Sequence, residues 1–447
     1  MVHVPSTFSS DNKDEANAMV ENSEAPLTGT TILDMTQFLS GPYCTQVLAD
    51  LGATVIKIES PQGDLSRTVP PHFVGDDSVY FLSTNRNKKS VVVDMKVPEG
   101  LELVRRLVLS SDVVVENFRP GVLERLGLRC VDLRSQKPSL VWCSISGFGQ
   151  DGPYNAKPAY DMIVQALSGA MSLTGEPGRP AVRAGIPIGD ISAGLYASTA
   201  ILAALHRRTL TGRGDSIDIS MLDCQAAMLS YQGAYYLHSG LVPPRQGTAH
   251  DSIPTYRSFR CGDEIEVVVT ANTERMWQSL CRVLGLEQLI DDPLFATSRQ
   301  RLLNRNALTP LLEEAFLRRD ANDWVPLLEA EGIPVGTVNT LDRVMKDAQI
   351  RHRGMVMNLF AEDGRETKVM GNPIVFGEAA RPRAVFPPML GQDTEEIVRT
   401  ALGASREEFD EFVRVGAVKC STHVTSSGET PSLSEIGLKE LIGDKQA

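Results

Sequence analysis

The sequence lacks the short motifs that mark several large enzyme classes. No GxGxxG follows the first apolar, β-rich run, no GxxxxGK(S/T) loop occurs and no GxSxG is present. These absences disfavour a dinucleotide-binding Rossmann domain, a P-loop enzyme and a hydrolase with a nucleophile elbow. The seven histidines never form HExxH or HxH, so we expect no metal site.

Cysteine is scarce and positive charge is in the minority. The seven cysteines are scattered and never form a CxxC pair, which predicts free thiols in a reducing, cytoplasmic setting. A formal net charge of −12 disfavours a nucleic-acid surface, which needs a basic stripe. We find no apolar run long enough to span a bilayer, and the acidic residues 1–27 fit neither a secretory signal nor a transit peptide. We therefore expect a soluble protein without nucleic-acid or membrane partners.

Length and patterning predict more than one domain. The chain has 447 residues, too many for one small core, and 42% of them are apolar. The polar, charged residues 1–27 are predicted to be a disordered extension and residues 416–447 a flexible tail. Between them we expect a large domain in two parts, 28–239 and 331–415, with a small domain formed by 240–330.

Strands alternate with helices in the first half of the chain. Short β-branched runs predict strands, and helical spacing fills the segments between them, which favours an α/β fold with a mostly parallel sheet covered on both faces. The predicted strands are residues 31–35, 54–58, 91–94, 113–116, 140–145 and 216–219. The more helical middle predicts single helices at 161–173, 190–208 and 221–237.

The predicted small domain begins with a hairpin and continues with helices, an α+β pattern. Residues 256–260 and 264–270 are the hairpin strands, on either side of a turn that contains Gly262 and Asp263. Helices are predicted at 274–285, 299–318 and 321–331, and strands at 333–338 and 355–360.

A series of short motifs is spread over most of the chain in a fixed order. They lie at residues 34–36 (DMT), 41–42 (GP), 48–53 (LADLGA), 56–59 (IKIE), 63–64 (GD), 85–90 (NRNKKS), 116–121 (ENFRPG), 146–149 (SGFG), 174–177 (TGEP), 211–214 (TGRG) and 388–394 (PMLGQDT). Together they resemble the CaiB/BaiF family, the class III CoA-transferases, which includes formyl-CoA transferases and α-methylacyl-CoA racemases.

The resemblance implies both a fold and an activity. It implies a Rossmann-like large domain without the dinucleotide fingerprint, a smaller α+β domain, and a ring-shaped chain that interlocks with a second copy as a homodimer. It implies a transferase that moves CoA from an acyl-CoA thioester to a carboxylic acid, with CoA as a substrate moiety and no tightly bound cofactor.

The resemblance also assigns residues to CoA. Lys88, Asn117, Phe118 and Arg125 match positions that contact CoA in relatives, and Leu39 matches a position whose backbone lies near the adenosine. Phosphate groups favour cations, and ligands of open α/β sheets gather at the carboxyl ends of strands, which suits Arg125. The alternatives are that Arg125 is a solvated charge and that Asn117 caps a helix.

The family mechanism uses a carboxylate nucleophile, which forms acyl and CoA intermediates in turn. In relatives this group is an Asp shortly after a Thr-Gly pair, and counting from Thr174 places Gly178 there. Glu176 is the carboxylate of this loop, so we predict that it takes over the role. Backbone N–H groups near Gly149 and Gly247 are candidate donors to the developing oxyanion.

Two alternatives to CoA transfer stay open. The resemblance matches Asp161 and Asp190 to acids of the racemases, which move an α-proton, although the racemase histidine falls at Tyr160. Both aspartates also begin apolar helical runs and are candidate helix caps. The other alternative is a CoA-binding protein without activity.

Overall fold

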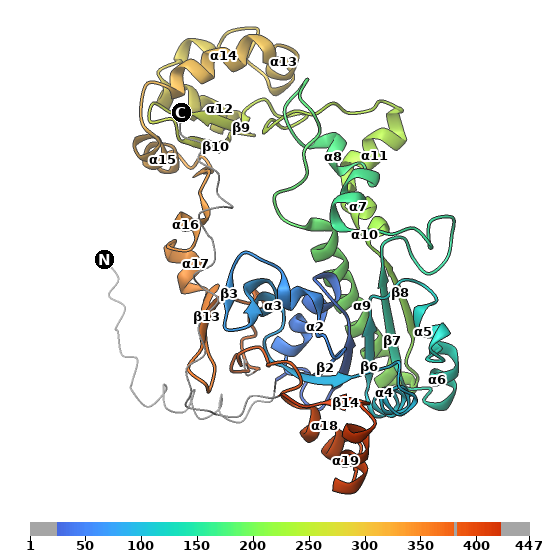
Figure 1. Ribbon diagram of the computed structural model, residues 1–447. Helices are drawn as coiled ribbons and strands as arrows, with labels where there is room; N and C mark the ends of the chain where they lie inside the picture. Colours follow the sequence, from blue (N-terminus) through green and yellow to red (C-terminus); the bar gives the residue numbers. More distant parts are fainter. Residues whose placement is uncertain (1–24, 380–381, 422–447) are drawn as a thin grey trace, which may run out of the picture.

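The structure is a computed structural model that describes residues 25–379 and 382–421. Most of the predicted N-terminal extension (1–24) and of the predicted tail (422–447) lies outside the described residues. The large domain is built on a seven-stranded sheet with the order β14-β5-β2-β1-β6-β7-β8 (Figure 1). These strands are β1 Thr31–Met35, β2 Thr54–Glu59, β5 Lys88–Val93, β6 Val113–Glu116, β7 Val141–Ser146, β8 Ser216–Ser220 and β14 Val418–Lys419.

The order of the six parallel strands is that of a doubly wound nucleotide-binding fold. Numbered along the chain, they lie in the order 3-2-1-4-5-6, and β14 adds an antiparallel edge. All six predicted strands are confirmed, whereas the prediction that the flexible tail begins at 416 is wrong, because β14 pairs with β5. The direction of strand addition reverses between β1 and β6. Ligands of such sheets bind at the carboxyl ends of the strands at this switch point.

Two helical layers cover the two faces of the sheet, and each closes a separate apolar core. Parallel strands read as continuous Val and Ile runs because both faces are buried. One layer comprises α4 Pro98–Ser110, α6 Cys130–Gln136, α18 Thr394–Ala401 and α19 Arg406–Arg414. The other comprises α2 Ser40–Asp50, α7 Asp161–Leu167, α9 Ile188–Thr211 and α10 Met221–Met228.

Three helices predicted as single are broken. The first breaks at Gly169, whose φ of 91° is left-handed, and the second at Ser230, whose φ is 48°. The third breaks at Asn304. The resulting second halves are α8 Ala170–Leu173, α11 Ser230–Ser239 and α14 Arg305–Phe316, the last following α13 Ser298–Leu303.

The small domain has its own core around a three-stranded antiparallel sheet, β11-β10-β9. The predicted hairpin is confirmed as β9 Tyr256–Arg260 and β10 Glu266–Thr270. Because β11 Val335–Thr337 pairs with β10, this sheet extends beyond the boundary predicted at residue 330. Its helices are α12 Glu274–Leu284, α13, α14 and α15 Ala321–Ala330.

Two separate connections join the small domain to the large one, so that the ribbon follows an open ring (Figure 1). One runs from α11 through residues 240–255 to β9, the other through α16 Leu341–Val344 and α17 Ala348–His352 to the hairpin β12 Val356–Phe360 and β13 Glu366–Met370. A 3₁₀ turn, Glu287–Leu289, follows α12 in the small domain, and the other remaining elements lie in the large domain. They are the 3₁₀ turn Leu65–Thr68, β3 Phe73–Val74, β4 Asp77–Ser78, α3 Val79–Thr84 and α5 Val122–Arg125.

Helix α9 corrects the prediction that no bilayer-length apolar segment exists. Among the described residues, it is long and apolar enough to cross a membrane by length and composition. Small residues supply much of this apolar character, so no run of large side chains draws attention to it. Half of its most apolar window is buried, and Gly194 packs against the backbone of Ser40 in α2, which is the position of a core helix.

Candidate active site

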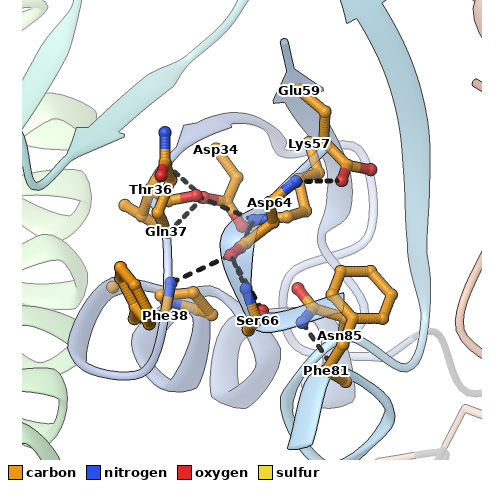
Figure 2. A network of polar contacts seen from close by, with 12 residues as sticks. Asp34, Thr36, Gln37, Phe38, Lys57, Glu59, Asp64, Ser66, Phe81 and Asn85 are labelled. Carbon is orange, nitrogen blue, oxygen red and sulfur yellow. Dashed lines mark hydrogen bonds and ion pairs between the residues drawn. The ribbon is translucent and has the colours of Figure 1, made fainter. Parts of the chain in front are cut away.

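The turn between β1 and α2 lies at the switch point, and buried side chains hold its backbone (Figure 2). Asp34 accepts hydrogen bonds from the Thr36 backbone N–H at 2.9 Å and from the Thr45 hydroxyl at 2.7 Å. The Phe38 N–H, in a residue with a φ of 63°, donates to Asp64 at 3.2 Å. A dinucleotide-binding domain has glycines in this turn, whereas here carboxylates fix it.

Asn117 links the two strands on either side of the switch point. Its Oδ1 accepts from the Gln37 N–H at 2.9 Å, and its Nδ2 donates to the Gln37 carbonyl at 2.8 Å. The carbonyl oxygen and the nitrogen of the Asn117 side chain therefore both join the end of β6 to the turn after β1. Leu39 follows this turn, is buried and begins α2, so its backbone lies beside the same switch point.

A buried network of charges supports this turn from below. Lys57 Nζ lies 2.9 Å from Asp64 and donates to the Thr36 carbonyl at 2.8 Å. Asp34 pairs with Lys88 at 3.0 Å, and neither side chain has any exposed surface. Unpaired charges at this depth would cost several kcal/mol each, so the pairing is required for folding.

The Lys88 ammonium group has no exposed surface with which to contact CoA, the role that the resemblance implies for this residue. Its ammonium group donates to Asp34, to the Pro42 carbonyl and to Asn85 Oδ1, at 2.9 to 3.0 Å. An ammonium group has three protons, and all three are taken. The ammonium group neutralises Asp34 in this arrangement, and a contact between Lys88 and CoA stays a prediction.

Phe118 and Arg125 follow β6 at the carboxyl edge of the sheet. The Phe118 N–H donates to Glu116 at 2.9 Å, and its ring packs partly buried against a core cluster. Arg125 and its neighbour Arg119 are exposed, and within the described ranges neither forms an ion pair. These two cations are free for an anionic ligand at the switch point.

Asp161 and Asp190 meet at the start of α9, which the sequence did not predict. Asp161 Oδ1 accepts from the backbone N–H of Gly189 at 2.7 Å and of Asp190 at 3.3 Å. Asp161 thus caps α9 from 28 positions away and does not cap its own helix. Asp190, whose carboxyl group receives a hydrogen bond from Ser40, lies near the start of α2.

The pairing of these two acids predicts a pH-dependent stability. Burial, with the charge of Asp161 adding to it and the Ser40 hydrogen bond opposing it, raises the pKa of Asp190 from 3.8 to about 7. The folded state then binds this proton more tightly than the unfolded state, so the free energy of unfolding falls as pH rises from about 4 to about 7. We expect Asp190→Asn to remove this fall, which urea unfolding at pH 5 and pH 8 would measure as about 2 kcal/mol relative to wild type. Parallel pH profiles for the two proteins would contradict this.

Glu176 lies where the loop after α8 meets the loop after α11. Its carboxylate packs directly on Gly247: a β-carbon built at that position would lie 2.4 Å from Glu176 Oε1. The Gly247 N–H donates to the Gly175 carbonyl at 3.0 Å, and the Gly149 N–H to the Ser146 hydroxyl at 2.9 Å. Neither of these predicted oxyanion donors is free, and only a glycine at 247 leaves room for the carboxylate.

A cavity of about 240 Å³ lies on the other side of this loop. Tyr231, Gln232, Gly247 and His250 are among the residues that line it. The His250 ring stacks on Tyr256 with centroids 5.3 Å apart, and its Nδ1 accepts from the Ser252 N–H at 3.1 Å.

Comparison with known proteins decides the class of this site. Residues 27–394 match the family described as CoA-transferase family III. The chain belongs to this family. Over 398 residues, 89% of its length, the transferase is 38% identical to the succinyl-CoA:glutarate CoA-transferase of Homo sapiens, of which it covers 91%. Over 384 residues it is 37% identical to the succinate–glutarate CoA-transferase of Agrobacterium fabrum. This match covers 84% of this chain and 96% of the relative.

The fold comparison agrees. The crystal structure of a CAIB/BAIF family protein from Brucella suis matches this CoA-transferase with a TM-score of 0.77 at 38% identity, covering 85% of this chain and 100% of that one. The predicted family, the mixed α/β fold with a mostly parallel sheet, and the enzyme class are thus confirmed. The protein transfers CoA from an acyl-CoA to a carboxylic acid.

The sequence missed several residues of the site of this CoA-transferase. Asp64, which holds the Phe38 N–H, lies within the Gly63-Asp64 motif, so a signal existed. Lys57 lies within the strand β2, between Val55, Ile56 and Ile58. A single lysine inside such an apolar run indicates a buried charge that needs a partner. Arg245, which lies beside the Glu176 loop, had no sequence signal.

Proposed function

We propose that this CoA-transferase moves CoA between short dicarboxylic acids through covalent intermediates on Glu176. The observation that carries the proposal is the close packing of the Glu176 carboxylate against Gly247. Between Thr174 and Gly189, Glu176 is the only carboxylate, in the loop where relatives carry the nucleophile. Succinate and glutarate, named for the human and Agrobacterium relatives, both carry a second carboxylate.

The chemistry proceeds by exchange at a carbonyl carbon. The Glu176 carboxylate attacks the donor thioester and releases CoA thiolate, which leaves an acyl–glutamyl anhydride. The thiolate then attacks the glutamyl carbonyl, so that the donor acid departs and Glu176 holds CoA as a thioester. The acceptor carboxylate reverses both steps and leaves as its CoA ester. Splitting one difficult exchange into easier steps is the advantage of a covalent nucleophile.

We infer that CoA binds at the switch point of the sheet. The exposed Arg119 and Arg125 suit its phosphates, since arginine forms paired hydrogen bonds with phosphate oxygens. Leu39 and Asn117 lie at the same switch point, where the adenosine would lie against the turn after β1. The proposal needs CoA as a substrate moiety and no further cofactor.

We further propose that two copies interlock as a homodimer. The ring-shaped ribbon supports this, and so do the exposed large apolar side chains on α7, α9, α10 and α11. Half or more of the Met162, Leu167 and Tyr235 side chains is exposed. The free thiols of all seven cysteines support a reducing, cytoplasmic setting.

The proposal is tested by a CoA-exchange assay. The purified protein is given succinyl-CoA with glutarate, and products are followed by mass spectrometry. We expect glutaryl-CoA and succinate in equal amounts, and hydroxylamine or borohydride added with the donor alone should modify Glu176. Exchange without modification of any carboxylate would overturn the covalent mechanism. Deuterium entering the acyl α-carbon without an acceptor would instead favour proton transfer by Asp161 and Asp190.

A further inference from the structure

Two hydrogen bonds join the Glu176 loop to the loop that begins after α11, one on each side of Glu176. The Gly247 N–H donates to the Gly175 carbonyl at 3.0 Å, and Arg245 Nη2 donates to the Arg179 carbonyl at 2.7 Å. The aliphatic part of Arg245 lies against Gly175, where a β-carbon would be 3.5 Å from its Cδ. The Arg245 side chain and the Glu176 carboxylate therefore belong to one small junction.

The Arg245 guanidinium is only partly used. It has five N–H donors, and the one contact to Arg179 leaves Nε and Nη1 without a partner among residues 25–379 and 382–421. It forms no ion pair within the same residues, although it is partly buried. Arg179 and Arg183, in the same loop as Glu176, are exposed, and Glu176 is the only carboxylate between Thr174 and Gly189.

We propose that Arg245 binds the distal carboxylate of the acid substrates and so makes the enzyme selective for dicarboxylic acids. This inference rests on the proposed function, in which the proximal carboxylate reacts at Glu176. A planar guanidinium presents parallel N–H groups that fit a carboxylate, and Arg245 has such groups unused beside the nucleophile. Its bond to Arg179 holds it in place, so little side-chain entropy is lost when substrate binds.

The selectivity for diacids follows because a substrate without a distal carboxylate leaves the Arg245 guanidinium unpaired. When the distal group is an ester, the Arg245 guanidinium gains no charged partner and its charge-assisted hydrogen bonds to the substrate are lost. A monocarboxylic acid or half-ester should therefore react more slowly than the diacid of equal length. The preference should reside in Arg245 and not in Arg183, which lies in the Glu176 loop and whose side chain reaches only its own neighbour's carbonyl.

The test compares glutarate with monomethyl glutarate as acceptors, with succinyl-CoA as donor, in wild type, Arg245→Met, Arg245→Lys and Arg183→Gln. In a ping-pong reaction, kcat/KM for the acceptor reports only the second half-reaction. We expect Arg245→Met to lower kcat/KM for glutarate about ten- to a hundredfold and to leave the half-ester nearly unchanged. Arg245→Lys should recover part of the diacid preference, and Arg183→Gln should resemble wild type.

The outcomes separate this inference from the function on which it rests. If Arg245→Met slows both acceptors equally, Arg245 acts only by holding the loop, and the inference is wrong while CoA transfer stands. An unchanged diacid preference in that variant would also overturn it. If the wild type exchanges no CoA with any acid, the proposed function fails and the inference fails with it.

Discussion

We expect Glu176→Gln to lose CoA exchange while keeping the fold intact. Glutamine keeps the shape of the side chain but is not a nucleophile, so neither the anhydride nor the enzyme–CoA thioester can form. We expect kcat/KM to fall by at least about 10³-fold, the scale seen when a covalent nucleophile is removed. The measurement is glutaryl-CoA formation from succinyl-CoA and glutarate, with mass spectrometry of the protein to show that the CoA adduct is also lost.

Two further variants make this result specific. Glu102→Gln changes an exposed carboxylate on α4 and should retain full activity. Gly247→Ala leaves Glu176 in the sequence but adds a β-carbon 2.4 Å from its Oε1, at a φ of +59° that disfavours alanine. We expect this variant to displace the carboxylate and lose activity with little loss of CoA binding. Normal turnover by Glu176→Gln would show that another acid is the nucleophile.

Much of the fold could be predicted because local patterns decide it. The predicted bounds of β1 and β6 agree with the structure to the residue, because short β-branched runs are typical of parallel strands buried on both faces. Helix breaks were missed because they depend on single backbone conformations. Ser230 adopts a left-handed φ, which L-residues other than glycine rarely adopt and which no sequence pattern announces.

The site was harder to predict because its residues act through partners far away in the chain. Lys88 looks like a phosphate-binding cation in the sequence, and only its pairing with Asp34, 54 positions away, shows that it is buried. Asp161 looks like the cap of its own helix, yet it caps α9. Glu59, at the end of β2, lies buried against Arg67. Spacing along the chain carries no information about such contacts.

Asp34→Asn should be the most destabilising change in the large domain. Asparagine keeps the size of Asp34 and part of its hydrogen bonding to Thr36 and Thr45, but it leaves the buried Lys88 without a counter-charge. Removing one partner of a buried pair costs about 3–5 kcal/mol. Urea unfolding at pH 7 measures this loss, with Asp342→Asn as the control. Asp342 pairs with Lys346 on the surface, and its loss should have no measurable effect.

The size of this loss should depend on pH in a way that identifies the pair. Burial alone would raise the pKa of Asp34, but Lys88, Lys57 and the threonine hydrogen bonds outweigh it and hold the pKa below the usual 3.8. Stability from this carboxylate is present above about pH 4 and is lost as pH falls toward its folded pKa. Burial, with a contribution from Lys57, lowers the pKa of Lys88 to about 8 despite Asp34, so the attraction also disappears as Lys88 loses its proton above pH 8. The difference between wild type and Asp34→Asn should therefore be largest between about pH 4 and pH 8 and should shrink on both sides. A difference that stays constant from pH 3 to pH 9 would mean that packing, and not charge, sets the cost.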